Sequence, residues 1–287
     1  MSQQHLDEAL QMIDTLAEKL GPTAQNDLAA LRQTIATAQQ HGEGQDADQL
    51  RATLEEQIVE NSKFISVMVH EIRKPLTSIR GYADMLGKNV MGELNEMQSQ
   101  FVETIRKNTI SMETLVSDIS DISKLHSGRL QPAQKMEMYK NIAMQLEKDM
   151  AGQAQEREVA LVFDTPEGLP LLNTDTARIT QALRKLIDNA IKYTPAGTGQ
   201  VIVRAENGGD KLHVHVEDNG IGITAEEQAR LGELFFRGDQ EQVTSTKGYG
   251  MGLPIAMACV SLIGGELAWQ STPGQGTIFT ITLPAMQ

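Results

Sequence analysis

The chain has 287 residues, a formal net charge of −13 and a pI near 4.9. This length suffices for about two domains, each with its own core. The acidic balance argues against a nucleic-acid-binding protein, because phosphate contacts require clustered Lys and Arg. No run of about 18 apolar residues is present, and the polar start lacks the apolar core of a signal peptide, so we expect a cytoplasmic protein without a membrane span. The single cysteine, Cys259, lies in an apolar helical stretch, which favours a buried inert thiol over a redox sensor.

Residues 1–50 are expected to form a short helical N-terminal extension. Two short helices are indicated on either side of Gly21-Pro22, and the polar stretch 41–48 predicts a break after them. The segment is too small for the usual ligand-sensing folds.

Residues 51–130 show the spacing of two helices joined by a short turn. Apolar residues recur in steps of four and three from Leu54 to Leu86, with Asn61 as the polar exception, and the spacing resumes from Leu94 to Ile122. The turn between them is expected around 87–95. The pattern predicts an antiparallel helical hairpin, and pairing two hairpins into a four-helix bundle would bury its apolar seam. We therefore expect a homodimer.

His70 is the candidate nucleophile of this hairpin. It lies two residues from both Met68 and Ile72, opposite the seam, and is expected to face solvent. A neutral imidazole is a competent nucleophile near neutral pH, and the carboxylate of Glu71 can keep the other ring nitrogen protonated. Pro75 removes an N–H from the helix and predicts a kink just past the histidine. An isolated surface histidine is otherwise an ordinary polar residue, so the case depends on the nucleotide motifs downstream.

Residues 127–134 read as a linker, and the domain boundary is expected within it, at residue 131. Residues 131–287 show the pattern of an α/β sandwich. Helices are expected at 139–154, 176–193 and 254–263, and strands at 200–206, 211–217, 266–271 and 277–283. The sequence Asn207-Gly-Gly-Asp210 predicts a hairpin turn between two of the strands.

Three glycine- or asparagine-centred motifs in this domain indicate a nucleotide pocket. Asp218-Asn-Gly-Ile-Gly222 follows a strand directly, and its two glycines allow close approach of the backbone to a ligand. Gly248-x-Gly-x-Gly252 precedes a helix, where backbone N–H groups can hold phosphate oxygens. Asn189 is either a satisfied core amide or an oxygen ligand of Mg²⁺. A capping box at Thr224–Glu227 starts a helix, and the polar stretch that follows Phe235–Gly238 is expected to be a mobile lid.

In this order the motifs resemble those of the sensor histidine kinases of two-component signalling, over about Arg51 to Pro284. His70–Pro75 is similar to the phospho-acceptor box of that family. The other boxes follow in the family's order: Asp175–Gln181 and Asn189–Pro195 resemble its asparagine box, Asp218–Gly222 its first glycine box, Phe235–Arg237 its phenylalanine box, Gly248–Leu253 its second glycine box, and Gly264-Gly265, Gly274–Phe279 and Leu283-Pro284 its last strands.

The resemblance implies ATP-dependent autophosphorylation of His70, with Glu71 as base or orienter, and transfer of the phosphoryl group to an aspartate in the receiver domain of a response regulator. It also implies the ATP-binding fold of gyrase-type ATPases, in which Asn189 holds Mg²⁺ and Asp218 accepts a hydrogen bond from the adenine amino group. The remaining ATP-binding residues that it implies are Lys192, Tyr193, Gly220, Gly222, Phe235, Arg237, Gly248, Gly250, Gly252, Leu253 and Thr277.

Three residues depart from the family pattern. Lys74 stands where the family usually has the Thr or Asn that positions water for phosphatase activity, Lys185 replaces the first asparagine of its box, and Gly232 replaces the first phenylalanine. We therefore expect strong kinase and weak phosphatase activity, unless Lys74 only contacts an acidic patch of the regulator. The alternative functions are a degenerate ATP-binding dimeric scaffold and an ATP-driven clamp, and the clamp leaves the hairpin that carries His70 unexplained.

Overall fold

The structure is a computed structural model that describes residues 45–88, 92–127, 130–246 and 248–286. The chain divides into two compact units, residues 1–63 and 64–287. Most of the expected N-terminal extension, residues 1–44, lies outside the described residues. The expected break at 41–48 is not seen at its far end, because residues 45–48 already belong to a helix.

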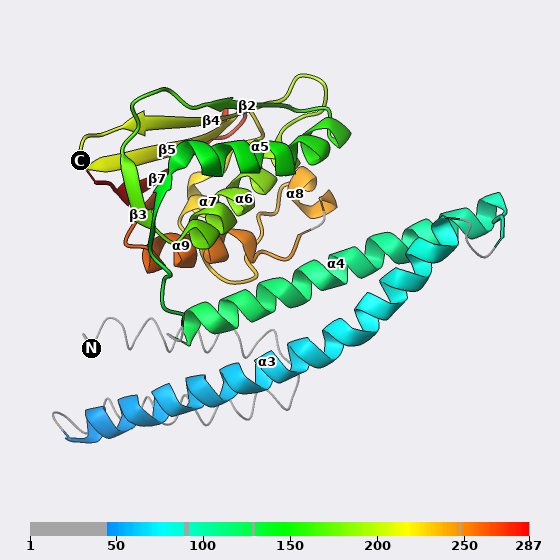
Figure 1. Ribbon diagram of the computed structural model, residues 1–287, viewed down its shortest axis with the longest axis horizontal. Helices are drawn as coiled ribbons and strands as arrows, with labels where there is room; N and C mark the ends of the chain where they lie inside the picture. Colours follow the sequence, from blue (N-terminus) through cyan, green and yellow to red (C-terminus); the bar gives the residue numbers. More distant parts are fainter. Residues whose placement is uncertain (1–44, 89–91, 128–129, 247, 287) are drawn as a thin grey trace. The chain divides into compact units, whose positions relative to one another are not determined.

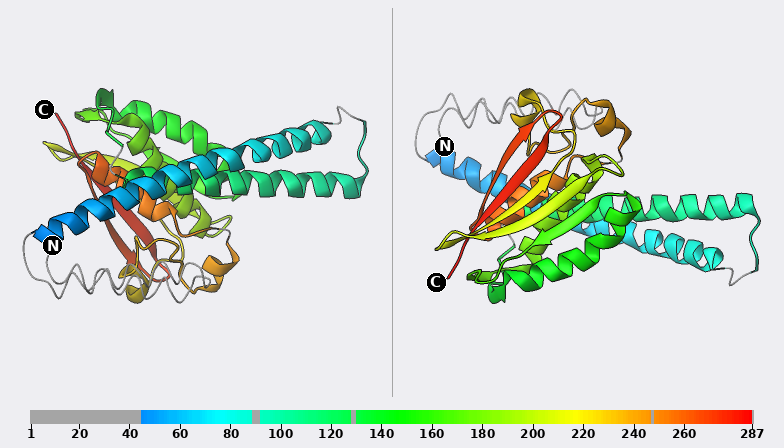
Figure 2. Two further views of the ribbon diagram at one scale, coloured as in Figure 1. Left: turned by 90° about the horizontal axis from the view of Figure 1, so that it is seen from below. Right: turned by 90° about the horizontal axis from the view of Figure 1, so that it is seen from above.

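Two long helices come first (Figures 1 and 2): α3 (Gln45–Gly87) and α4 (Glu96–His126). The α/β domain follows with β1 (Lys135–Met138), α5 (Tyr139–Glu156), β2 (Ala160–Asp164), β3 (Leu171–Thr174), α6 (Thr176–Tyr193), β4 (Gln200–Asn207), β5 (Lys211–Asp218), α7 (Ala225–Gln228), α8 (Glu241–Ser245), α9 (Gly252–Leu262), β6 (Glu266–Thr272) and β7 (Gly276–Pro284). No helix in the described ranges is both long and apolar enough to cross a bilayer.

The predicted hairpin is confirmed. Its second helix starts where Asn95 and Gln98 form a capping box, each side chain accepting the backbone N–H of the other at 2.9 Å. The later part of α3 runs alongside α4 (Figure 2), where Val69 and Leu76 pack with Val116, and α3 continues through Pro75 without interruption.

The face that closes the hairpin differs from the expected seam. Its core consists of Val69, Leu76 and Val116, with Ile65 and Ile119 packed against them. Most of the seam residues on α3 are instead exposed, among them Met68, Ile72, Ile79 and Tyr82. A helix can carry two apolar stripes, and the spacing of apolar residues alone does not say which stripe contacts the other helix of the same hairpin.

The α/β domain is a two-layer sandwich. Its five-stranded sheet has the order β2-β4-β5-β7-β6, in which only β2 and β4 run parallel. Helices α5, α6 and α9 cover one face of the sheet (Figure 1), because alternate residues of each strand point into the core, as Leu212, Val214 and Val216 do in β5. A small second sheet pairs β1 with β3.

Helix α4 packs against this domain as well as against α3. Its residues Leu115, Ile119, Ile122 and Leu125 lie on the core formed by the sheet and its helices. The second unit thus joins one helix of the hairpin directly to the α/β domain.

Candidate functional site

A cavity of about 400 Å³ opens between α6, α9, the loop after β5 and the segment that precedes α9. Most of the pocket residues expected from the sequence line it: Asn189, Lys192, Tyr193, Asp218, Gly222, Arg237, Gly248, Gly250, Gly252, Leu253 and Thr277. Gly220 and Phe235 are not in the lining. Phe236 takes the position in the wall, with the guanidinium of Arg230 4.1 Å from its ring centre, whereas the Phe235 side chain is exposed.

Asp218 contributes a buried carboxylate to the lining of the cavity. It is the last residue of β5 and pairs in register with Thr277 of β7, so the sheet itself places these two side chains together. Its carboxylate accepts the backbone N–H of Gly220 at 2.8 Å, which gives Gly220 a supporting role just behind the wall. Burial raises the pKa of Asp218 to about 6, although the hydrogen bonds from Gly220 and Thr277 act in the opposite direction.

Gly222, in the loop after β5, and Gly276, at the start of β7, are required by close backbone contacts. A Cβ atom at Gly222 would lie 2.1 Å from the carbonyl oxygen of Thr272, and the φ angle of Gly222 is +66°. A Cβ atom at Gly276 would lie 1.9 Å from the carbonyl oxygen of Asp218. No other residue fits at either position without moving the backbone.

Helix α6 carries Lys185, Asn189 and Lys192 of the cavity lining. Asp175 caps its start, accepting the N–H groups of Ala177 and Arg178 at 3.0 and 3.2 Å, as expected of an N-cap residue. The ammonium of Lys192 pairs with Asp188 at 2.5 Å, one turn earlier on the same helix. Asn189 faces the start of α9, because a Cβ atom added at Gly252 would lie 3.7 Å from its amide group.

The segment before α9 is held by Arg237. Its guanidinium donates to the carbonyl oxygens of Gly248 at 3.1 Å and Thr246 at 2.6 Å, and also to that of Val243. The stretch expected to be a lid contains the short helix α8. The three hydrogen bonds from Arg237 hold this stretch to the residue that precedes it. Because Gly252 is the first residue of α9, the unpaired N–H groups of the first turn lie beside the cavity, an arrangement suited to anions.

His70 lies outside the cavity lining, on the hairpin. Its side chain is 68% exposed, as expected, and its Nδ1 atom lies 3.4 Å from Oε1 of Glu71. The same oxygen accepts a hydrogen bond from Lys74 at 2.7 Å. The hydrogen bond from Lys74, and then that from His70, lowers the pKa of Glu71, so this side chain is a carboxylate at neutral pH. Nε2 is the ring nitrogen that points away from this pair.

Cys259 and the two histidines of β5, His213 and His215, lie outside the cavity lining. Cys259 is buried, and burial raises the pKa of its thiol to about 11, which makes it a poor nucleophile. His213 and His215 stack on one face of β5 and contact the hydroxyl groups of Thr282 and Thr280 at 3.1 and 2.9 Å. The described residues contain no cluster of three or more His, Cys, Asp or Glu that could hold a metal ion.

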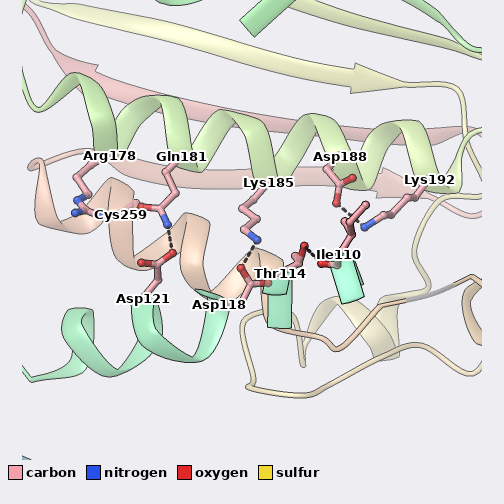
Figure 3. Close-up of polar contacts among 10 residues, drawn as sticks. All are labelled: Ile110, Thr114, Asp118, Asp121, Arg178, Gln181, Lys185, Asp188, Lys192 and Cys259. Carbon is pink, nitrogen blue, oxygen red and sulfur yellow. Dashed lines mark hydrogen bonds and ion pairs between the residues drawn. The ribbon is translucent and has the colours of Figure 1, made fainter. Parts of the chain in front are cut away.

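Sequence reasoning missed the contribution of α4 to this cavity. Ile110, Ser111, Thr114 and Asp118 are part of its wall. Figure 3 shows Asp118 pointing at Lys185 of α6, and Asp121 pointing at Gln181 one turn away. The only signal in the sequence was Lys185 itself, a cation at a position where the resemblance predicts an amide.

Comparisons with known proteins agree with this arrangement. Residues 60–128 match the family described as His Kinase A (phospho-acceptor) domain, and residues 174–287 match the family of histidine kinase-, DNA gyrase B- and HSP90-like ATPases. The non-motile and phage-resistance protein of Caulobacter vibrioides is 32% identical over 228 residues, which cover 78% of this chain and 27% of that protein. The histidine protein kinase DivJ of the same organism is 30% identical over 264 residues, covering 92% of this chain and 43% of DivJ.

The fold has a counterpart among solved structures. Full-length ShkA in complex with AMPPNP matches with a TM-score of 0.66 at 24% identity, over 78% of this chain and 46% of ShkA. The chain spans less than half the length of these relatives. Two family domains in the expected order, together with a relative that is a named histidine protein kinase, establish that this chain belongs to the sensor histidine kinases of two-component signalling.

Proposed function

We propose that this protein is an ATP-dependent protein-histidine kinase that phosphorylates itself on His70 and passes the phosphoryl group to an aspartate of a response regulator receiver domain. The observation that carries the proposal is the combination of an exposed imidazole beside a carboxylate with a cavity whose lining includes both a buried carboxylate and a glycine-rich helix start. In this proposal residues 51–130 form the phosphotransfer hairpin, residues 131–287 the ATP-binding domain, and residues 1–50 an extension.

The groups that line the cavity suit the different parts of ATP. The carboxylate of Asp218 accepts a hydrogen bond from the adenine amino group, with Thr277 beside it. The phosphates lie at the first turn of α9 and along Gly248–Gly252, where backbone N–H groups act as donors. Lys192 and Arg237 supply positive charge to the same wall, and Tyr193 and Leu253 contribute contact surface.

The residues also fit Mg²⁺ that binds together with the nucleotide. Mg²⁺ usually keeps several waters and takes only one or two protein ligands besides substrate phosphates. The amide oxygen of Asn189, beside the start of α9, is such a ligand. When bound, the ion neutralises charge on the phosphates.

The geometry at His70 indicates which nitrogen reacts. In the proposed reaction the neutral imidazole keeps its proton on Nδ1, 3.4 Å from Oε1 of Glu71, and Nε2 holds the lone pair. Nε2 attacks the γ-phosphorus, the bond to the β,γ-bridging oxygen breaks, and ADP leaves with that oxygen. The imidazolium that forms is stabilised by the ionised Glu71. Attack by a carboxylate oxygen of the regulator on this phosphorus then returns a neutral imidazole and yields an acyl phosphate.

A homodimer is part of the same proposal. The hairpin exposes large apolar side chains along both helices, including Phe64, Val67, Met68, Ile72, Ile79, Tyr82, Met97, Phe101, Ile105 and Met112. An apolar surface of this extent favours association with a second hairpin.

Incubation with γ-labelled ATP tests the proposed activity. We expect label on the protein that is labile in acid and stable in alkali, as a phosphoramidate is. Release of free phosphate without labelled protein would indicate an ATPase, and neither product would indicate an ATP-binding scaffold.

A further inference from the structure

Lys185 and Asp118 form an ion pair between α6 and α4 inside the cavity wall (Figure 3). Nζ of Lys185 lies 2.5 Å from Oδ1 of Asp118, and the two side chains are only 19% and 12% exposed. Both residues line the cavity. A largely buried ammonium requires an anionic partner, and in the structure the carboxylate of Asp118 on α4 is that partner.

The position of Lys185 relative to the glycine segment indicates a second partner. Lys185 precedes Asn189 by one helical turn on α6. A Cβ atom at Gly252 would lie 3.9 Å from Cδ of Lys185 and 3.7 Å from the amide of Asn189. The side chain of Lys185 therefore runs past the first residue of α9, where the N–H groups of the helix start favour a phosphate.

We propose that Lys185 is a phosphate-binding residue, and that the carboxylate of Asp118 occupies the place of a phosphate on its ammonium when no nucleotide is bound. The inference rests on the proposed function, since it assumes that the cavity takes a nucleoside triphosphate. Lys185 can donate up to three hydrogen bonds, but an incoming phosphate displaces the carboxylate beside it through like-charge repulsion. Nucleotide and α4 then compete for one ammonium, and each weakens the binding of the other.

The neighbouring contact between the same helices provides a matched control. Nε2 of Gln181 donates to Oδ2 of Asp121 at 2.7 Å, one turn from the ion pair, and neither residue lines the nucleotide cavity. Leu115, Ile119 and Ile122 also hold α4 against the domain. Loss of either polar contact alone thus leaves the helix in place.

The test is calorimetric titration of the full chain with ATP and Mg²⁺, and separately with adenosine, which has no phosphate. For Lys185→Met we expect ATP affinity to fall at least about 10-fold, because a charge-assisted contact is lost, while adenosine affinity stays within about 2-fold. For Asp118→Ala, and for the isosteric Asp118→Asn, we expect ATP affinity to rise several-fold. Asp121→Ala should leave it unchanged, and Asp118→Ala should have no effect in a chain that already carries Lys185→Met.

Three results would overturn the inference while leaving the proposed function intact. The first is that Lys185→Met binds ATP as tightly as the unmodified chain does, and the second is that Lys185→Met weakens the binding of adenosine as much as that of ATP. The third is that Asp121→Ala raises ATP affinity as much as Asp118→Ala does. The second result would mean a deformed pocket, and the third a general loosening of α4. Lys185→Gln, which keeps a polar side chain, repeats the measurement if the Met variant does not fold. Absence of ATP binding by the unmodified chain would overturn the proposed function as well.

Discussion

His70 and Asp218 lie in opposite kinds of surroundings. The side chain of His70 is 68% exposed and is oriented only by Glu71, its neighbour in the same helix. Asp218 is 9% exposed and is positioned by the register of two strands. A nucleophile that must meet a second domain has to stay accessible, whereas a carboxylate that recognises one ligand benefits from a dry site in which its hydrogen bond is strong. The exposed position of His70 adds little to the stability of the fold. The burial of Asp218 lowers that stability, because burial disfavours the ionised form of its carboxyl group.

The largest expected effect is at the exposed site. We expect His70→Gln to abolish autophosphorylation and to leave ATP affinity within a few-fold, because His70 is not part of the cavity lining. Labelling with γ-labelled ATP and calorimetry measure the two quantities. His213→Gln, on the face of β5, is the control and should keep full labelling. Acid-labile label that persists on the His70 variant would move the phospho-acceptor elsewhere.

The exposed apolar face of the hairpin should determine the oligomeric state. We expect Phe101→Glu combined with Ile105→Glu to convert a dimer into a monomer, because both side chains are exposed on α4 and charge there opposes association. Light scattering at micromolar concentration measures this. Met144→Glu, equally exposed on α5, should leave the dimer intact. A monomeric unmodified chain would remove the basis for the four-helix bundle.

At the buried site one substitution should change affinity and stability in opposite directions. Asp218→Asn removes a charge-assisted hydrogen bond to adenine, so ATP affinity should fall by about 1.5–3 kcal/mol. Without nucleotide, the free energy of unfolding at pH 7 should rise by up to about 3 kcal/mol, because the folded chain no longer buries a carboxylate whose pKa is about 6. Denaturant titration and calorimetry test the pair of effects. A variant that loses both affinity and stability would indicate simple damage to the sheet.

The same carboxyl predicts a pH dependence. Its folded pKa of about 6 is above the unfolded value, so the folded state binds the proton more tightly, and stability from this group declines as pH rises from about 4 to about 6. ADP affinity should change in the other direction and fall as pH drops through about 6, because the neutral acid is a weaker acceptor. ADP titrations between about pH 5 and pH 8 should show this slope in the unmodified chain. The slope should be smaller in Asp218→Asn, where only the titration of the ADP phosphate, at about pH 6, remains.

The smallest expected effect concerns Lys74. Its ammonium has no acceptor for an attacking water and engages the oxygen of Glu71 that also faces His70. Lys74→Thr should therefore raise dephosphorylation of the phospho-regulator several-fold, measured as loss of label from the regulator over time. Arg73→Thr, at the adjacent position, is the control. Rapid dephosphorylation by the unmodified chain, unchanged by Lys74→Thr, would show that Lys74 only contacts the regulator.

Much of the α/β domain and of its pocket could be predicted from the sequence, because the signals are local. Helix α6 has its N-cap at Asp175 and an apolar stripe at helical spacing, and β5 alternates strictly between inward and outward residues. The φ angle of +66° at Gly222 favours glycine locally, whatever residues pack around it. These features depend only on neighbours a few residues away, so the chain specifies them by itself.

The remaining features depend on contacts between distant residues, and only the tertiary structure decided them. Strand β2 is short and forms because it pairs in parallel with β4, and β1 and β3 exist only as each other's partner. The choice between Phe235 and Phe236 for the cavity wall, and the stripe of α3 that faces α4, likewise follow from packing. The pairing of Lys185 with Asp118, 67 positions earlier, has no local signal at all. It arises because the apolar face of α4 packs on the domain, and that packing brings a carboxylate to a buried cation.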